Sequence, residues 1–255
     1  MSTIEIIPSE TRSRGLGLMA AAAAVYLGLR LAGFHRLFTE DREGIGALLE
    51  IIGTLYSVVY AFATYVIWGQ FAAVENEILK ESGALKDLIQ FSRSLKEAAR
   101  DPIVRAVRAY ARAVLESEWS MLSRGEDTER TDKLFANIIS SVVEVKPAGD
   151  PEARAHQHLL EISSQASAHR DERLALSAKR IPQTLLLFVI ITAFTILFLL
   201  LFFPFHNLAL GLVAVAIATM LLFFAHFVLT DLDNPFEGAW NVDAKSFRDL
   251  ATKYH

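Results

Sequence analysis

One apolar stretch of the sequence carries polar side chains at a spacing that could form the wall of a water-filled passage. Within residues 45–74, small or polar residues recur at alternate steps of four and three, which places them on one helix face. They are Glu50, Thr54, Ser57, Ala61, Thr64 and Trp68. Glu50 is the most informative, because a membrane carboxylate is costly and faces protein or water. Three interpretations stay open: a pore or its outer mouth, tight helix packing, or exposure of Glu50 at the membrane surface.

A neighbouring face of the same stretch is apolar and is formed by Ile51, Leu55, Val59 and Phe62. Rings of such residues, one from each subunit, can form a hydrophobic constriction that gates by dewetting. An apolar stripe in a single membrane helix more commonly faces lipid. Any pore built from it would lie on the symmetry axis of an oligomer.

Three acids follow the last apolar stretch, within "TDLDNPFEGAW" at residues 230–240. They are Asp231, Asp233 and Glu237. The C-terminal end of a helix carries partial negative charge and disfavours acids, so these carboxylates need a cationic partner. We expect a Lys or Arg side chain there, and a divalent cation such as Ca²⁺, bound by carboxylate and carbonyl oxygens, is the alternative.

Other chemistry finds little support in the sequence. The chain has no cysteine, which excludes disulfides and thiolate sites. It contains no GxGxxG, phosphate-binding loop or HExxH motif. Glu116 and Glu118 lie two residues apart and therefore on different faces of a helix, whereas acid–base catalysis needs convergent groups. The net charge of −4 and the lack of a basic tract argue against nucleic acid as a partner. The sequence predicts no enzyme and no required cofactor.

Four apolar segments predict an all-α membrane protein, with spans over residues 16–38, 45–74, 182–203 and 208–230. The third and fourth segments are joined by "PFHN" at residues 204–207 and form a membrane hairpin. The first segment, with arginines before an alanine-rich core, also resembles a secretory signal peptide. A membrane anchor fits it better, because hydrophobicity resumes after Arg30.

Basic residues predict the orientation, since Lys and Arg accumulate on the cytoplasmic side. Arg12 and Arg14 precede the first span, Lys179 and Arg180 precede the third, and the 204–207 turn carries neither residue type. We expect a cytoplasmic N-terminus over residues 1–15, a cytoplasmic domain over 75–181 and a cytoplasmic tail over 231–255. The predicted location is the inner (plasma) membrane, with the lipid bilayer as a partner.

The inserted segment 75–181 reads as helices without any strand pattern. The second span continues into it without a proline, which predicts one long helix. Asp101-Pro102 has the pattern of an N-cap followed by a first-turn proline, and Gly125 is a helix stop. The helix between them places five apolar residues on one broad face: Ile103, Val107, Tyr110, Val114 and Trp119. Residues 128–145 and 152–180 are predicted as two further helices, separated by "KPAGDP".

Several stretches resemble the bestrophin anion channels and, more closely, the bacterial bestrophin-like membrane proteins of uncharacterised function. Residues 58–77, "VVYAFATYVIWGQFAAVENE", resemble the second span of bestrophins, and "LDNPFEG" at 232–238 resembles the turn after their last span. "YARAVLESEWSML" at 110–122 and "AHRDERL" at 168–174 resemble the bacterial group. The order and spacing of these stretches around the spans extend the resemblance over most of the chain.

The resemblance implies a homo-oligomer, typically a pentamer, in which the second span surrounds a pore for small ions. When Trp68 is used to align this span with the second span of bestrophins, the constricting neck would fall on Ile51, Leu55 and Val59. Glu50 at the outer mouth would favour cations, against the anion preference of bestrophins. The acidic run that binds Ca²⁺ in animal bestrophins is missing after Glu237. A non-conducting membrane scaffold or sensor, whose cytoplasmic helices bind a partner, is the alternative function.

Overall fold

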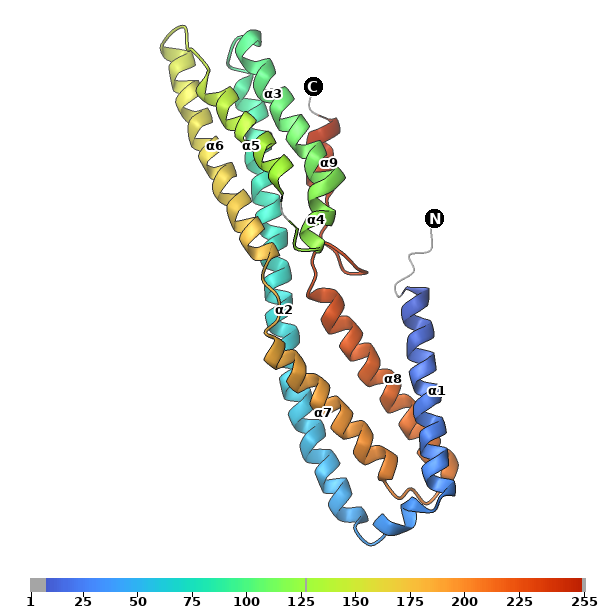
Figure 1. Cartoon of the computed structure of the whole chain (residues 1–255). Helices are drawn as coiled ribbons and strands as arrows, with labels where there is room; N and C mark the ends of the chain where they lie inside the picture. Colours follow the sequence, from blue (N-terminus) through green and yellow to red (C-terminus); the bar gives the residue numbers. More distant parts are fainter. Residues whose placement is uncertain (1–7, 127, 254–255) are drawn as a thin grey trace. The chain divides into compact units, whose positions relative to one another are not determined.

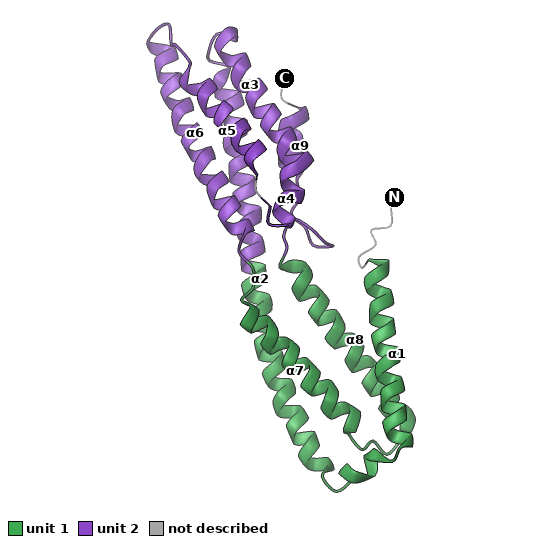
Figure 2. Ribbon diagram, in the orientation of Figure 1, with its two compact units in different colours: residues 1–68, 180–233 green, residues 69–179, 234–255 purple. Residues whose placement is uncertain are grey.

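The computed structural model describes residues 8–126 and 128–253, and in that part of the chain every regular element is a helix. Two compact units are formed (Figures 1 and 2). Unit 1 contains residues 1–68 and 180–233, and unit 2 contains residues 69–179 and 234–255. The predicted all-helical fold is confirmed.

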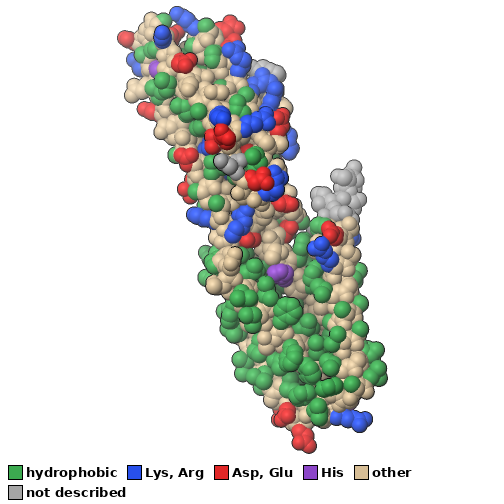
Figure 3. All heavy atoms as spheres, viewed as in Figure 1, with side chains coloured by type: hydrophobic (Ala, Val, Ile, Leu, Met, Phe, Trp, Pro, Cys, Tyr) green, Lys and Arg blue, Asp and Glu red, His purple; other side chains and the backbone are tan. Residues whose placement is uncertain are grey.

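Unit 1 holds the apolar helices. They are α1 (Ser9–Leu31), the first part of α2 (Arg42–Ser92), α7 (Gln183–Phe202) and α8 (Leu208–Leu232), with the short 3₁₀ helix η1 (Phe34–Phe38) after α1. By length and composition, α1, α2, α7 and α8 could each cross a membrane. Hydrophobic side chains dominate the face of this unit that is visible in Figure 3.

Close packing between α1 and α8 organises part of unit 1. Tyr26 of α1 lies directly against Gly211 of α8, where a Cβ atom would come within 1.9 Å of the tyrosine hydroxyl. A small residue is therefore required at this contact, as is common between membrane helices. The hairpin between α7 and α8 is fixed by Asn207, whose side chain accepts hydrogen bonds from the backbone N–H groups of Ala209 and Leu210. This is ordinary N-capping.

The first apolar helix differs from the predicted span 16–38. It ends at Leu31, because Gly33 adopts a left-handed conformation with φ of 81° and the chain continues as η1. It also begins earlier, at Ser9. The ends of α7 and α8 agree with their predicted ranges within two residues, whereas α2 begins three residues before its predicted span and continues to Ser92 as one helix.

Unit 2 is a bundle built around a large hydrophobic core. Its elements are the second part of α2, α3 (Glu97–Ala113), the π-helical turn η2 (Val114–Glu118), α4 (Trp119–Ser123), α5 (Glu129–Val143), α6 (Asp150–Ser177) and α9 (Lys245–Thr252). Ile103, Val107 and Tyr110 on α3 are fully buried in this core, as their spacing predicted. α3 packs against α5 and α9, and these helices lie side by side in Figure 1.

Two local features of unit 2 differ from the sequence-based expectation. Asp101 is not an N-cap: α3 begins at Glu97 after an extended Lys96, and Pro102 lies inside the helix. Pro102 is the sixth residue of α3, so it lacks the N–H that would donate to the Ala98 carbonyl. Helix α9 was not predicted, because eight residues give little periodicity, yet its Phe247 and Leu250 are buried in the core.

Candidate functional site

The part of α2 within unit 1 presents a continuous apolar line to its surroundings. Ile51, Leu55 and Phe62 are 65%, 45% and 58% exposed, and Val58 is 63% exposed. Leu48 and Tyr65 extend the same line, so that exposed residues recur at steps of three and four from 48 to 65. Such spacing keeps one straight seam on a helix, and a helix can present such a seam to lipid, to copies of itself or to an axis.

Val59, the remaining member of the predicted neck, lies at a different position. It is half-buried, whereas its neighbour Val58 is exposed on the seam. The seam of α2 is therefore formed by Ile51, Leu55, Val58 and Phe62 together with Leu48 and Tyr65. These six residues are the α2 seam.

The predicted polar stripe runs beside the α2 seam, and its hydroxyl groups bond to their own helix. Thr54 donates to the Glu50 carbonyl at 2.8 Å, Ser57 to the Gly53 carbonyl at 2.8 Å, and Thr64 to the Tyr60 carbonyl at 2.9 Å. These hydroxyls need no external partner, so they tolerate either lipid or water. The Glu50 side chain is exposed and makes no hydrogen bond or ion pair within the described residues.

The three acids predicted near the end of α8 are divided between the two units. In unit 1, Asp233 is the C-cap residue of α8 and its Oδ1 accepts a hydrogen bond from the Ile181 backbone N–H at 2.8 Å. Burial raises the pKa of Asp233, against the effects of this bond and of the Arg180 charge. In unit 2, Glu237 is exposed. Among the described residues, no group of three or more His, Asp or Glu side chains could hold a metal ion.

A second polar cluster lies inside unit 2 and is fully enclosed. The Arg173 guanidinium on α6 bridges two buried carboxylates: Nε donates to Glu81 Oε2 and Nη2 donates to Glu118 Oε1, both at 2.6 Å. None of these three side chains is exposed. Burial alone would lower the pKa of Arg173, but the charges of Glu81 and Glu118 help raise it well above its usual range. Arg173 is therefore held as a cation between two helices.

Tyr110 and Arg170 connect the rest of this cluster. Tyr110 donates its hydroxyl proton to Glu81 and accepts hydrogen bonds from Arg170 at 3.1 Å and Arg173 at 3.2 Å. Burial, followed by the Glu81 charge, raises the pKa of Tyr110 well above its usual value. Nη2 of Arg170 also donates a hydrogen bond to Asp132 on α5. Thr131, the residue before Asp132, donates its hydroxyl proton to Glu118. The "buried network" of Glu81, Tyr110, Glu118, Thr131, Arg170 and Arg173 thus joins α2, α3, η2, α5 and α6, and the half-exposed Asp132 adjoins it at the surface.

Glu77 forms a further contact between α2 and α6, one helical turn before Glu81. It accepts hydrogen bonds from Lys80 at 2.7 Å and from His169 Nδ1 at 2.8 Å. Burial disfavours the ionised form, but the two hydrogen bonds and the charges of their donors outweigh it and lower the pKa of Glu77. The ionised carboxylate therefore stabilises the fold.

Sequence reasoning found parts of this network without recognising it. It separated Glu116 from Glu118, and the structure agrees: Glu116 is exposed near Arg130, while Glu118 is buried. The available signal was the spacing of the charges. Glu77 and Glu81 lie one turn apart on α2, Arg170 and Arg173 lie one turn apart on α6, and both pairs share faces with buried apolar residues. The π-helical turn that ends at Glu118 was not predictable from the pattern.

Comparisons with known proteins agree with this architecture. A bacterial Bestrophin homolog from Klebsiella pneumoniae, solved as a point mutant, matches with a TM-score of 0.73 and 13% identity over 93% of this chain and 98% of that chain. A structure of a Bestrophin homolog from the same organism, phased on zinc, matches with a TM-score of 0.70 and 12% identity over 94% and 99% of the two chains. At this identity the likeness establishes the fold. No curated protein sequence matches. A family profile described as a Bestrophin-like domain matches residues 16–247. The chain therefore belongs to the bestrophin-like family.

Proposed function

We propose that the protein is an oligomeric ion channel of the bacterial inner membrane. It conducts small ions passively, without a catalytic step, through an axial pore lined by α2. The observation that carries this proposal is the α2 seam, which leaves six large apolar side chains exposed in one straight row. In a symmetric ring, the same seam from each subunit would face a shared axis.

The chemistry of the seam suits a gate rather than a binding site. Ile51, Leu55, Val58 and Phe62 would form successive apolar rings, which restrict ion flow by excluding water when the pore is narrow. The hydroxyls of Thr54 and Ser57, already bonded to the helix backbone, could line wider sections without an unsatisfied donor. Glu50 would add a ring of negative charge at the outer mouth.

The proposed topology has four membrane spans with both termini and unit 2 in the cytoplasm. Its support is the distribution of basic residues, since Lys and Arg accumulate on the cytoplasmic side of a membrane. Arg12 and Arg14 lie at the start of α1, and Lys179 and Arg180 precede α7. A pentamer is proposed from the family resemblance alone.

Single-channel recording in planar bilayers tests this function. Leu55→Ala and Val58→Ala should raise conductance by widening the apolar rings, with Val58→Ala exceeding Val59→Ala if the α2 seam faces the axis. The control is Ile191→Ala, which truncates an exposed apolar residue on α7 and should leave conductance unchanged.

A non-conducting scaffold, the alternative function, would give a different result with the same purified wild type and variants. A dimer in which α2 packs dry against its copy, with no current from any ion in the wild type or in the alanine variants, would refute the channel. Imaging of the oligomer in nanodiscs, with measurement of an axial pore radius, separates the two directly.

A further inference from the structure

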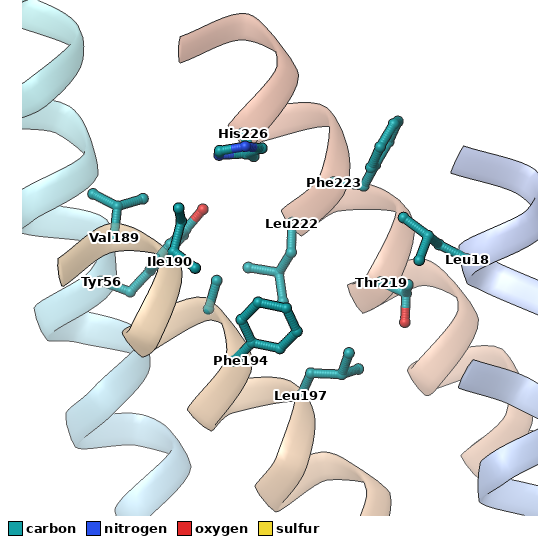
Figure 4. Close-up of a pocket in the computed structure, with 11 residues that line it drawn as sticks. Leu18, Tyr56, Val189, Ile190, Phe194, Leu197, Thr219, Leu222, Phe223 and His226 are labelled. Atoms are coloured by element: carbon teal, nitrogen blue, oxygen red, sulfur yellow. The ribbon is translucent and has the colours of Figure 1, made fainter. Parts of the chain in front are cut away.

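A cavity of about 300 Å³ lies within unit 1, and its walls are almost entirely apolar (Figure 4). Helices α7 and α8 supply most of its lining, with Leu18 from α1 and Tyr56 from α2. All four membrane-type helices of the chain therefore contribute to it. Small-molecule sites in proteins are typically concave and apolar, with a few polar groups that orient the ligand.

Two polar atoms at this cavity have no partner within the described residues. They are the hydroxyl oxygen of Tyr56 and Nδ1 of His226, and both are buried. The third polar side chain of the lining behaves differently, because the Thr219 hydroxyl donates to the Val215 carbonyl at 2.8 Å. A buried polar atom without a hydrogen bond is unfavourable, so Tyr56 and His226 are the two groups that a ligand could satisfy.

The neighbourhood of these two residues is fixed by a contact between their helices. Tyr60 stacks on Tyr56 with ring centroids 5.8 Å apart, and its hydroxyl donates to the carbonyl of Ala225, the residue before His226, at 3.2 Å. In Figure 4, His226 lies at one end of the lining side chains, with Leu197 at the other. The lining is thus apolar apart from Tyr56, Thr219 and His226, and its unpaired polar atoms belong to Tyr56 and His226.

The size of the cavity limits what can fill it. It has about twice the volume of the ~150 Å³ engineered cavity that holds one benzene, which corresponds to about twelve carbon atoms by the same ratio. Water is a poor occupant, because an ordered water needs two to four polar partners and most of this lining offers none. An apolar chain with one polar end matches both the volume and the two unpaired atoms.

We propose that this cavity binds a single-chain amphiphile of the bilayer, about twelve carbons long, through one neutral hydroxyl group at Tyr56 and His226. A hydroxyl both donates and accepts, so it can donate to Nδ1 of a neutral imidazole and accept from the tyrosine hydroxyl. A charged head group would have to give up its hydration inside the membrane and has no ion-pair partner among the lining residues.

Photolabelling in nanodiscs of phosphatidylethanolamine and phosphatidylglycerol tests the proposal. The probe is 1-dodecanol carrying a diazirine on its chain, and peptide mass spectrometry locates the label. We expect labelling on α7 and α8 residues that line the cavity. Unlabelled 1-dodecanol should compete about tenfold better than dodecane, the factor given by two hydrogen bonds of modest net strength.

Variants separate the polar and apolar parts of the site. Tyr56→Phe removes only the hydroxyl oxygen, so it should abolish most of the advantage of dodecanol over dodecane; His226→Leu should act in the same direction. Ala193→Leu, or Ala193→Val if the larger variant does not fold, should reduce labelling by filling the cavity. Tyr65→Phe, on the same helix but 77% exposed, is the control and should change neither competition nor labelling.

Three results would overturn the proposal. They are equal competition by dodecanol and dodecane in the wild type, full retention of the dodecanol advantage in Tyr56→Phe, and labelling outside the cavity. Occupation by a phospholipid acyl chain would appear as the first result, because its head group stays outside and leaves Tyr56 and His226 unpaired. These readouts do not depend on ion conduction.

Discussion

Arg173 and Glu118 form a salt bridge in which neither side chain is exposed, with Nη2 donating to Oε1 at 2.6 Å. The two residues are 55 positions apart in the sequence and lie on α6 and at the end of η2. A buried ion pair offsets its desolvation cost only when its geometry is good and its other hydrogen-bonding groups are satisfied. Glu81 and Tyr110 supply additional bonds to Nε and Nη2 of Arg173, while its buried Nη1 has no hydrogen-bond partner within the described residues.

Replacing Arg173 should therefore destabilise the protein strongly. Arg173→Met leaves Glu81 buried without an ion-pair partner and Glu118 with only the 3.4 Å contact to Arg170, and we expect the free energy of unfolding to fall by about 3–5 kcal/mol. The measurement is denaturant unfolding of the full chain in detergent. Arg154→Met is the matched control, since Arg154 lies on the same helix but is exposed. Equal stability of the two variants would show that the buried network contributes nothing to the fold.

The lowered pKa of Glu77 should make the stability of the protein depend on pH. The pKa is lowered in the folded state, so the stabilisation by Glu77 is present above the ordinary carboxyl pKa and is lost as the pH falls through the lower, folded-state pKa. Glu77→Gln should lower the midpoint of thermal unfolding at pH 7, and the difference from the wild type should shrink as the solution is acidified below about pH 4. Glu75→Gln, an exposed neighbour on α2, should be neutral at both values. A difference that is constant with pH would contradict this assignment.

Glu50 predicts the ion preference of the proposed pore. If a ring of these carboxylates lies at the mouth, it raises the local concentration of cations. Glu50→Gln should shift the reversal potential under a KCl gradient toward that of a less cation-selective pore, and the shift should diminish at high salt. Glu40→Gln, which lies in the loop before α2, is the control. An unchanged reversal potential in Glu50→Gln would remove this residue from the conduction path.

Gly211 predicts a steric limit between α1 and α8. A methyl group there would overlap the Tyr26 ring, so Gly211→Ala should destabilise unit 1 by about 1–3 kcal/mol, as overpacking does elsewhere. The loss would appear as a lower thermal unfolding midpoint in detergent. Gly28→Ala has open space around it and should be neutral or slightly stabilising. Adding Tyr26→Leu to Gly211→Ala should recover part of the loss; no recovery would contradict the clash.

Variants of Asp233 and the addition of CaCl₂ can distinguish a structural role of this carboxylate from a metal-binding role. The Asp233 carboxylate accepts from the Ile181 N–H, so Asp233→Asn, which keeps an acceptor, should be milder than Asp233→Ala, which loses about 1 kcal/mol. We expect millimolar CaCl₂ to leave the thermal unfolding midpoint unchanged relative to EDTA. A calcium-dependent increase that Asp233→Asn abolishes would instead establish the alternative Ca²⁺ site.

The sequence determined the parts of this protein that depend on local composition. Long apolar segments are enough to predict α2, α7 and α8. In lipid the backbone N–H and C=O groups of such a segment must bond to one another, and a helix achieves this within one segment. The periodicity of Ile103, Val107 and Tyr110 was likewise enough to predict the buried face of α3. The end of α1 was harder to predict, because the apolar run continues beyond Leu31 while the backbone reverses at Gly33.

Only the tertiary structure decided which polar groups meet. Arg173, Glu81 and Glu118 come from three different elements, and no local rule relates their positions. The choice between Val58 and Val59 on the α2 seam also required the packed unit, because neighbouring residues on a helix differ by about 100° in direction and exposure depends on the adjacent helices. The cavity at Tyr56 and His226 likewise depends on tertiary packing, because its lining residues come from four different helices. Local sequence specifies helices and their apolar faces, whereas long-range packing specifies the partners of each buried polar atom.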